Sequence, residues 1–88
     1  MTVTTIEPAA VIARRDWLLA EIRRTGGVWT VRRAEAVMHG SPWPSTGRNT
    51  ARKDLKSLAG RGALVALDNE ITGRRSYTPR VFNLRSVA

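Results

Sequence analysis

The sequence lacks cysteine altogether and contains a single histidine, His39. Without thiols the chain can form neither disulfides nor thiolate zinc sites, and it has no cysteine nucleophile. One histidine is too few for a multi-histidine metal site and makes a histidine-activated serine improbable as well. The sequence shows no other catalytic constellation and no small-molecule site. We therefore expect a protein that is not an enzyme, with no metal and no cofactor.

Long apolar runs are also missing. No segment approaches the ~18 consecutive apolar residues of a membrane span. The first five residues have neither the basic nor the apolar region of a secretory signal, so we expect none. Hydrophobic residues still make up 42% of the chain, which favours a folded domain. We expect a cytoplasmic protein that contacts no membrane and lies with the nucleoid if it binds DNA.

Acidic residues are scarce. The chain has 7 Asp and Glu against 15 Lys and Arg, which gives a net charge of +8. A GC-rich genome can explain why most of these cations are arginine, but it does not explain the excess of positive charge. That excess indicates an acidic partner, with nucleic acid ahead of a membrane surface. A length of 88 residues is one small domain, with little room for a separate effector domain.

Apolar spacing and turn residues predict three helices followed by a hairpin. The helices are expected at 8–25, 31 to about 39, and about 45–59. Thr30 is a suitable N-cap for the second helix, and Ser45 or Thr46 for the third.

The hairpin follows the third helix. Residues 63–67 predict a buried strand, and residues 76–78 begin a return strand after a turn at Gly73. Pro79 indicates that the return strand ends there or lies at an edge. This order is an α+β fold, a helix-turn-helix with a β-ribbon wing. We expect it over residues 8–84, between tails at 1–7 and 85–88.

The third helix has one apolar and one cationic face. Ala51, Leu55 and Leu58 cluster on one side of a helical wheel, and the other side combines cations with hydroxyl and amide groups. Lysine and arginine neutralise phosphates, and arginine and asparagine can bind bases in the major groove. A solvated basic face is the ordinary alternative. The single acid of this region, Asp54, is expected to pair locally with Arg or Lys.

A motif in this helix resembles a known family. The stretch is Asn49-Thr50-Ala51-Arg52-Lys53-Asp54-Leu55-Lys56-Ser57-Leu58, followed by Gly62-Ala63-Leu64-Val65. It is similar to the recognition helix and first wing strand of GntR-like and DeoR-like winged helix-turn-helix transcription regulators of bacteria. The resemblance implies that Thr50, Arg52 and Lys53 contact DNA. The chain departs from the family in having the small Ala51, and in a long loop at 41–47 that holds Trp43 between prolines.

Two further segments complete the predicted interface. Arg74 and Arg75 lie at the expected wing tip, where arginine can enter a minor groove, although Asp68 and Glu70 cancel the charge of this turn. The start of the second helix, including Arg33, lies where such proteins approach the DNA backbone. The predicted DNA-binding residues are Thr30, Arg32, Ser45, Thr46, Arg48, Asn49, Thr50, Arg52, Lys53, Lys56, Arg74 and Arg75.

The three tryptophans are expected to have different roles. Trp29 should pack where the first helix meets the short extended segment, and Trp43 should pack beneath its loop. Trp17 lies off the main apolar stripe, where it is either an isolated exposed aromatic or a dimer contact. The first-helix arginines, such as Arg14 and Arg15, are expected to be little more than solvated surface.

These observations favour a sequence-specific double-stranded DNA-binding protein, a small transcriptional regulator such as a repressor. One alternative is an accessory factor of a mobile element, in replication, conjugation or excision. Another is a winged-helix module that docks an acidic protein partner. A homodimer on palindromic DNA is also open, with an interface around Trp17 or residues 81–84.

Overall fold

The computed structural model describes residues 9–80 of the chain. The expected tails at 1–7 and 85–88, and the segment 81–84, lie outside the described residues. Within 9–80, no helix has the length and apolar character needed to cross a membrane.

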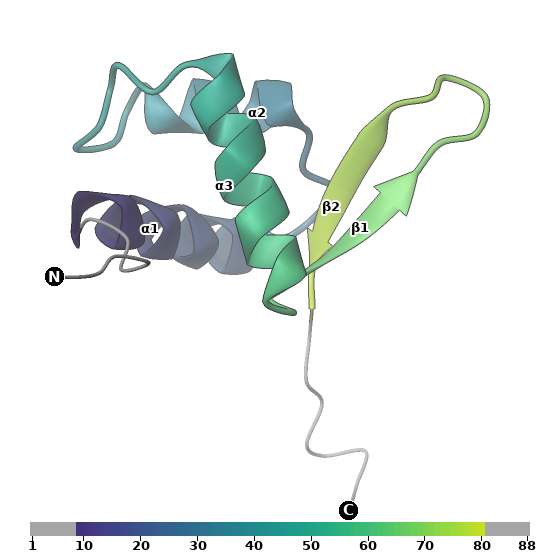
Figure 1. Cartoon of the computed structure of the whole chain (residues 1–88), viewed down its shortest axis with the longest axis horizontal. Helices are drawn as coiled ribbons and strands as arrows, with labels where there is room; N and C mark the ends of the chain where they lie inside the picture. The colour runs from purple at the N-terminus through teal and green to yellow at the C-terminus, as the bar shows by residue number, and fades with distance from the viewer. Residues whose placement is uncertain (1–8, 81–88) are drawn as a thin grey trace, which may run out of the picture.

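Three helices are followed by one antiparallel hairpin. The elements are α1 (Ala9–Thr25), α2 (Val31–Met38), α3 (Arg48–Gly60), β1 (Leu64–Asp68) and β2 (Arg75–Pro79). Figure 1 shows α3 crossing in front of α1, with the hairpin projecting away from the helices. This confirms the α+β class, and the topology is winged-helix-like.

A glycine pair separates α1 from the extended segment before α2. Gly26 and Gly27 have φ of 67° and 82°, a left-handed conformation that glycine adopts without steric cost. Trp29 then forms an isolated bridge with Tyr77, through backbone hydrogen bonds of 2.6 and 2.7 Å. Its indole Nε1 donates to the carbonyl of Gly26 at 3.0 Å. Trp29 is thus buried where the first helix meets the extended segment, as predicted, and its bridge to Tyr77 also joins this segment to the hairpin.

The helix caps agree with prediction at α2 and differ at α3. Thr30 is the N-cap of α2, and its hydroxyl accepts a hydrogen bond from the N–H of Arg33 at 3.1 Å. The prediction of Ser45 or Thr46 as the N-cap of α3 is wrong, because Gly47 occupies that position without a side-chain cap. The helix therefore begins at Arg48.

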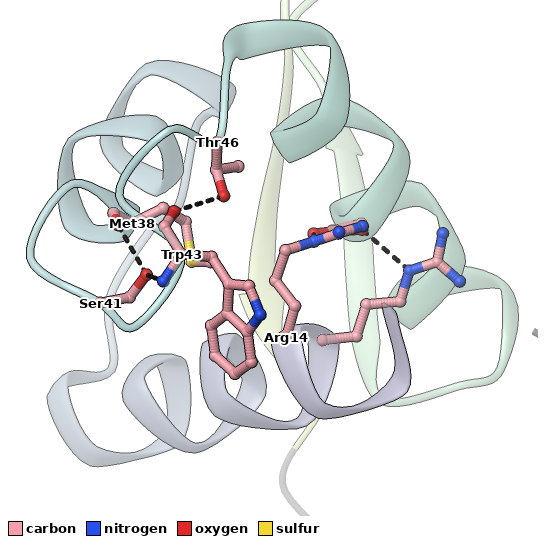
Figure 2. A network of polar contacts seen from close by, with 7 residues as sticks. Arg14, Met38, Ser41, Trp43 and Thr46 are labelled. Carbon is pink, nitrogen blue, oxygen red and sulfur yellow. Dashed lines mark hydrogen bonds and ion pairs between the residues drawn. The ribbon is translucent and has the colours of Figure 1, made fainter. Parts of the chain in front are cut away.

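The loop before α3 uses its hydroxyl groups internally. The buried Thr46 hydroxyl donates to the carbonyl of Trp43 at 2.7 Å. Ser41 donates to the carbonyl of Met38 at 2.6 Å and accepts from the N–H of Trp43 at 2.9 Å. These bonds satisfy backbone groups that the two prolines leave outside regular structure. They also orient the Trp43 indole, which points from the loop toward α1 in Figure 2.

One hydrophobic core joins all the elements. Its fully buried large side chains are Trp29, Leu18, Ile22, Met38, Leu55, Leu58 and Leu64. Burying each such side chain contributes roughly 1.5–3 kcal/mol. Trp17 and Trp43 are partly buried and pack against this core. The packing of Trp43 is confirmed, and Trp17 is not an isolated exposed aromatic.

Each strand of the hairpin has one buried residue, Leu64 in β1 and Tyr77 in β2. The strands pair from Leu64 with Pro79 to Asp68 with Arg75. Only Leu64 of β1 is buried, so the prediction of a wholly buried strand is wrong. A sheet of two strands has no second layer to cover it, and its outer part is therefore exposed. Pro79 ends β2, as predicted.

Candidate nucleic-acid interface

A groove of about 510 Å³ lies between the start of α2, the exposed side of α3 and the hairpin. We call it the cationic groove. Its lining residues are Thr30, Val31, Arg32, Arg48, Arg52, Lys56, Arg74, Arg75 and Tyr77. Six of these nine side chains are Lys or Arg, so the groove is suited to an anionic partner.

Helical periodicity explains the row of cations on α3. Arg48, Arg52 and Lys56 are spaced four residues apart, so they follow one another along one side of the helix. Arg52 Nη1 donates to Asn49 Oδ1 at 2.8 Å, which holds these two exposed side chains together. This side of α3 therefore presents a guanidinium and an amide beside each other.

Carboxylates balance only part of the charge in the cationic groove. Arg48 Nε lies 3.7 Å from the Glu35 carboxylate, and Arg75 Nε lies 2.8 Å from that of Asp68. The other cations of the groove have no ion pair within the described part of the chain: Arg32, Arg52, Lys56 and Arg74. Because cations outnumber nearby carboxylates, the groove has a positive potential that attracts phosphates.

The Arg75–Asp68 pair spans the two strands of the hairpin. Arg75 donates to both oxygens of Asp68, at 2.8 and 3.4 Å. This hydrogen bonding lowers the pKa of Asp68 and raises the pKa of Arg75. Both side chains are more than half exposed, so the pair orients Arg75 more than it stabilises the fold.

The inner side of α3 holds a charge of its own. Asp54 is fully buried, and it accepts hydrogen bonds from Arg14 Nε at 2.6 Å, Arg14 Nη2 at 2.8 Å and Arg15 Nε at 2.9 Å. The prediction that Asp54 pairs locally is wrong, because both partners lie on α1. Figure 2 shows Arg14 extending from α1 to this contact.

Arg14 and Arg15 are therefore structural residues. Their side chains are only 15% and 12% exposed, which corrects the expectation of solvated surface. Asp54 directly precedes the core residue Leu55 and lies on the part of α3 that packs on α1. A carboxylate buried there requires cationic partners from the facing helix.

The start of α2 contributes one arginine to the cationic groove and keeps another within the fold. Arg32 is exposed and lines the groove. Arg33 stacks over the Trp29 ring, 4.0 Å from its centroid, and donates to the carbonyl of Val28 at 2.9 Å. The hydroxyl of Thr30 is committed to the cap described above. Arg32 is therefore the better placed of the two arginines for a phosphate.

The fold brings together most of the predicted DNA-binding residues. Seven line the cationic groove: Thr30, Arg32, Arg48, Arg52, Lys56, Arg74 and Arg75. Asn49 and Lys53 are exposed on α3, Thr50 is half-buried, and Ser45 is exposed in the preceding loop. Thr46 is the exception, because its side chain is buried and bonded to Trp43.

Sequence reasoning missed two residues that line the groove, Val31 and Tyr77. Tyr77 is almost fully buried at the base of the groove, and Val31 lies half-buried at the start of α2. Neither carries a charge, so nothing in the pattern of cations pointed to them. The only signal in the sequence is that Val31 directly follows Thr30 and that Tyr77 lies two residues after Arg75, on the same face of β2.

The site is thus a cationic groove on a winged-helix-like fold of residues 9–80. No protein-family model, curated protein or solved structure matches this chain. Its function is therefore inferred from the geometry and chemistry of its own residues.

Proposed function

We propose that the protein binds double-stranded DNA sequence-specifically and acts as a small transcriptional regulator. The observation that carries this proposal is the cationic groove, in which six Lys and Arg side chains from α2, α3 and the hairpin converge. Convergence of cations from three elements is what a phosphate backbone requires, whereas a merely solvated face needs no such arrangement.

In this proposal α3 enters the major groove. A major groove about 12 Å wide admits one α-helix. The Asn49–Arg52 pair would face the base edges, where asparagine can bind adenine and arginine can bind guanine through two hydrogen bonds. The hydrogen bond between them orders both side chains before DNA binds, which reduces the conformational entropy lost on binding.

The remaining cations would hold the DNA backbone. Arg32 lines the groove from α2, Lys56 from α3, and Arg74 from the turn of the hairpin. Phosphate contacts of this kind set orientation and register, and they provide affinity that falls with salt. Specificity would then come from α3, and affinity from all three elements.

Selection of binding sites from random duplex DNA tests the proposal. We expect an enriched motif, and we expect Arg52→Ala to lose preference at one base position, by about 1–3 kcal/mol. Arg23→Ala, which removes the same charge from the exposed side of α1, should leave the motif unchanged.

Three results would count against the proposal. Recovery of no motif above random DNA would remove the claim of specificity. A motif that maps to an origin or attachment site rather than to promoters would replace regulation with a mobile-element role. Failure to bind any duplex, together with a tight complex with an acidic protein, would assign the groove to a protein partner instead.

A further inference from the structure

The tip of the hairpin carries an apolar side chain that neither the core nor the cationic groove uses. Ile71 is 95% exposed, whereas the other exposed large apolar residues of 9–80 are 42–54% exposed. Turns favour glycine, proline, asparagine, aspartate and serine, each for a conformational reason that isoleucine does not share. Folding of the described residues gives no account of an isoleucine at this position.

The turn itself is well ordered by internal hydrogen bonds. Asn69 Oδ1 accepts from the N–H groups of Ile71 at 2.9 Å and Thr72 at 3.0 Å. The Asn69 N–H donates to the carbonyl of Arg74, and the Gly73 N–H to that of Asn69. With its backbone bonded in this way, the turn presents Ile71 outward. A pre-ordered contact loses little conformational entropy when it binds.

Charge does not explain what the tip contacts. Residues 68–75 contain two acids and two arginines, so the segment is neutral, and Glu70 directly precedes Ile71. A carboxylate at this position opposes a phosphate contact. The attraction available to Ile71 itself is therefore apolar, whereas Arg74 lies on the groove side of the turn. Stacked bases offer apolar surface where the DNA backbone does not.

The hairpin has the length to reach a second groove. Five residues in each strand span about 17 Å at about 3.3 Å per residue. Half a turn of B-DNA is also about 17 Å, so a protein with a helix in one major groove can reach the next minor groove over this span. Figure 1 shows the hairpin diverging from α3, which carries the tip away from the helix.

We propose that Ile71 is an apolar wedge for DNA, entering the minor groove beside the major groove that α3 occupies. This inference rests on the proposed DNA binding and adds a second contact to it. Isoleucine is among the side chains that partly unstack a base step and kink the duplex. Pyrimidine–purine steps deform most easily, so the wedge adds a preference for such a step outside the reach of α3.

Ligase-catalysed circularisation of a short fragment tests the wedge. A mixed-sequence duplex of about 120 base pairs is shorter than the persistence length of DNA and closes poorly without a bend. We expect the wild-type protein to raise the circular product several-fold, and Ile71→Ala to return it to the level without protein. Affinity for the same duplex should fall by less than about tenfold, because the phosphate contacts remain.

Two control variants sharpen the experiment. Ile71→Leu keeps an apolar wedge and should retain most of the circularisation. Ile12→Ala makes the same chemical change at a partly exposed position of α1 and should behave as wild type. Because Ile71 is almost fully exposed, Ile71→Ala should fold normally, which circular dichroism verifies.

The outcomes separate this inference from the proposed function. Wild-type protein that binds the duplex but does not promote circles, or Ile71→Ala that promotes them equally, would overturn the wedge and leave DNA binding intact. Absence of any duplex binding would overturn both. If Ile71→Ala instead abolished self-association seen by light scattering, with circularisation unchanged, the tip would contact a second copy of the chain rather than DNA.

Discussion

The two sides of α3 hold charge in opposite ways. On the inner side, one carboxylate, Asp54, is fully buried and bonded to Arg14 and Arg15 of α1. On the outer side, Arg52 and Lys56 line an open groove and have no ion pair within residues 9–80. The helix is therefore attached to the fold by one set of charges and offers another set to a partner.

This difference shows why the net charge alone is a poor guide to the interface. Arg14 and Arg15 belong to the same cationic excess as Lys56, yet they are needed for packing. Burial separates the two classes, because a desolvated charge requires a partner, whereas an exposed one is stabilised by water. Variants that remove one class at a time should therefore have separable effects.

The largest expected effect is on stability, from the inner side. Asp54→Ala leaves two largely buried guanidiniums without their shared carboxylate. Breaking such a contact from one side costs about 3 kcal/mol, which corresponds to a fall in thermal midpoint of roughly 15 °C for a domain of this size. Thermal unfolding followed by circular dichroism measures this.

A matched control for this variant is Asp16→Ala. Asp16 is 59% exposed and lies 3.4 Å from Arg61, so its loss should cost about 0–1 kcal/mol. Equal destabilisation by the two variants would mean that the buried contact adds nothing beyond a surface ion pair.

A smaller effect is expected in the loop that precedes α3. Thr46→Val keeps the shape of the side chain but removes the buried hydroxyl that bonds to Trp43. We expect a loss of about 1 kcal/mol in the free energy of unfolding, with no change in affinity for DNA. Chemical denaturation and duplex titration measure the two quantities.

The neighbouring Ser45→Ala provides the comparison, since Ser45 is exposed. It should leave stability unchanged. If Thr46→Val lost DNA affinity but no stability, Thr46 would belong to the DNA interface. That result would contradict a structural role for its buried hydroxyl.

The smallest effect is expected at the Arg75–Asp68 pair, and it depends on pH. Arg75 lowers the pKa of Asp68 from its usual 3.8, so ionised Asp68 favours the folded state. This contribution is present above the usual pKa and is lost as pH falls through the lowered value. Asp68→Asn should therefore be slightly less stable than wild type at neutral pH, and the difference should shrink as the pH falls below the usual pKa of Asp68 and through the lowered one.

Thermal midpoints of both proteins across this range provide the test. A difference that persisted unchanged in strong acid would show that the side chain acts through something other than its charge.

Local patterns were sufficient to predict much of the fold. The order of elements, the Thr30 cap, and the core positions Ala51, Leu55 and Leu58 were all predicted correctly. Each depends on spacing or turn chemistry within a few residues. The buried part of β1 was overestimated, because a run of apolar residues does not reveal how much of the strand other elements will pack against.

Contacts between distant segments were not predictable from such patterns. Asp54 finds its partners 39 and 40 residues away, whereas the local rule considers only neighbours three or four residues apart. Local patterns predict that the Thr46 hydroxyl caps the third helix, but in the structure it donates a hydrogen bond to the carbonyl of Trp43 within the loop. Among the predicted interface residues, Arg48, Arg52 and Lys56 line the groove together, because helical periodicity places them along one side of α3.

The salt dependence of binding tests the central claim, that the cationic groove neutralises DNA phosphates, most directly. Fluorescence anisotropy with a labelled duplex of about 30 base pairs should give a slope of log affinity against log salt of about −3 to −5, from three to six phosphates. Lys56→Ala should make the slope shallower by about one, and Arg23→Ala should leave it unchanged. Equal changes for the two variants, or a slope near zero for the wild type, would contradict the assignment of the groove to DNA.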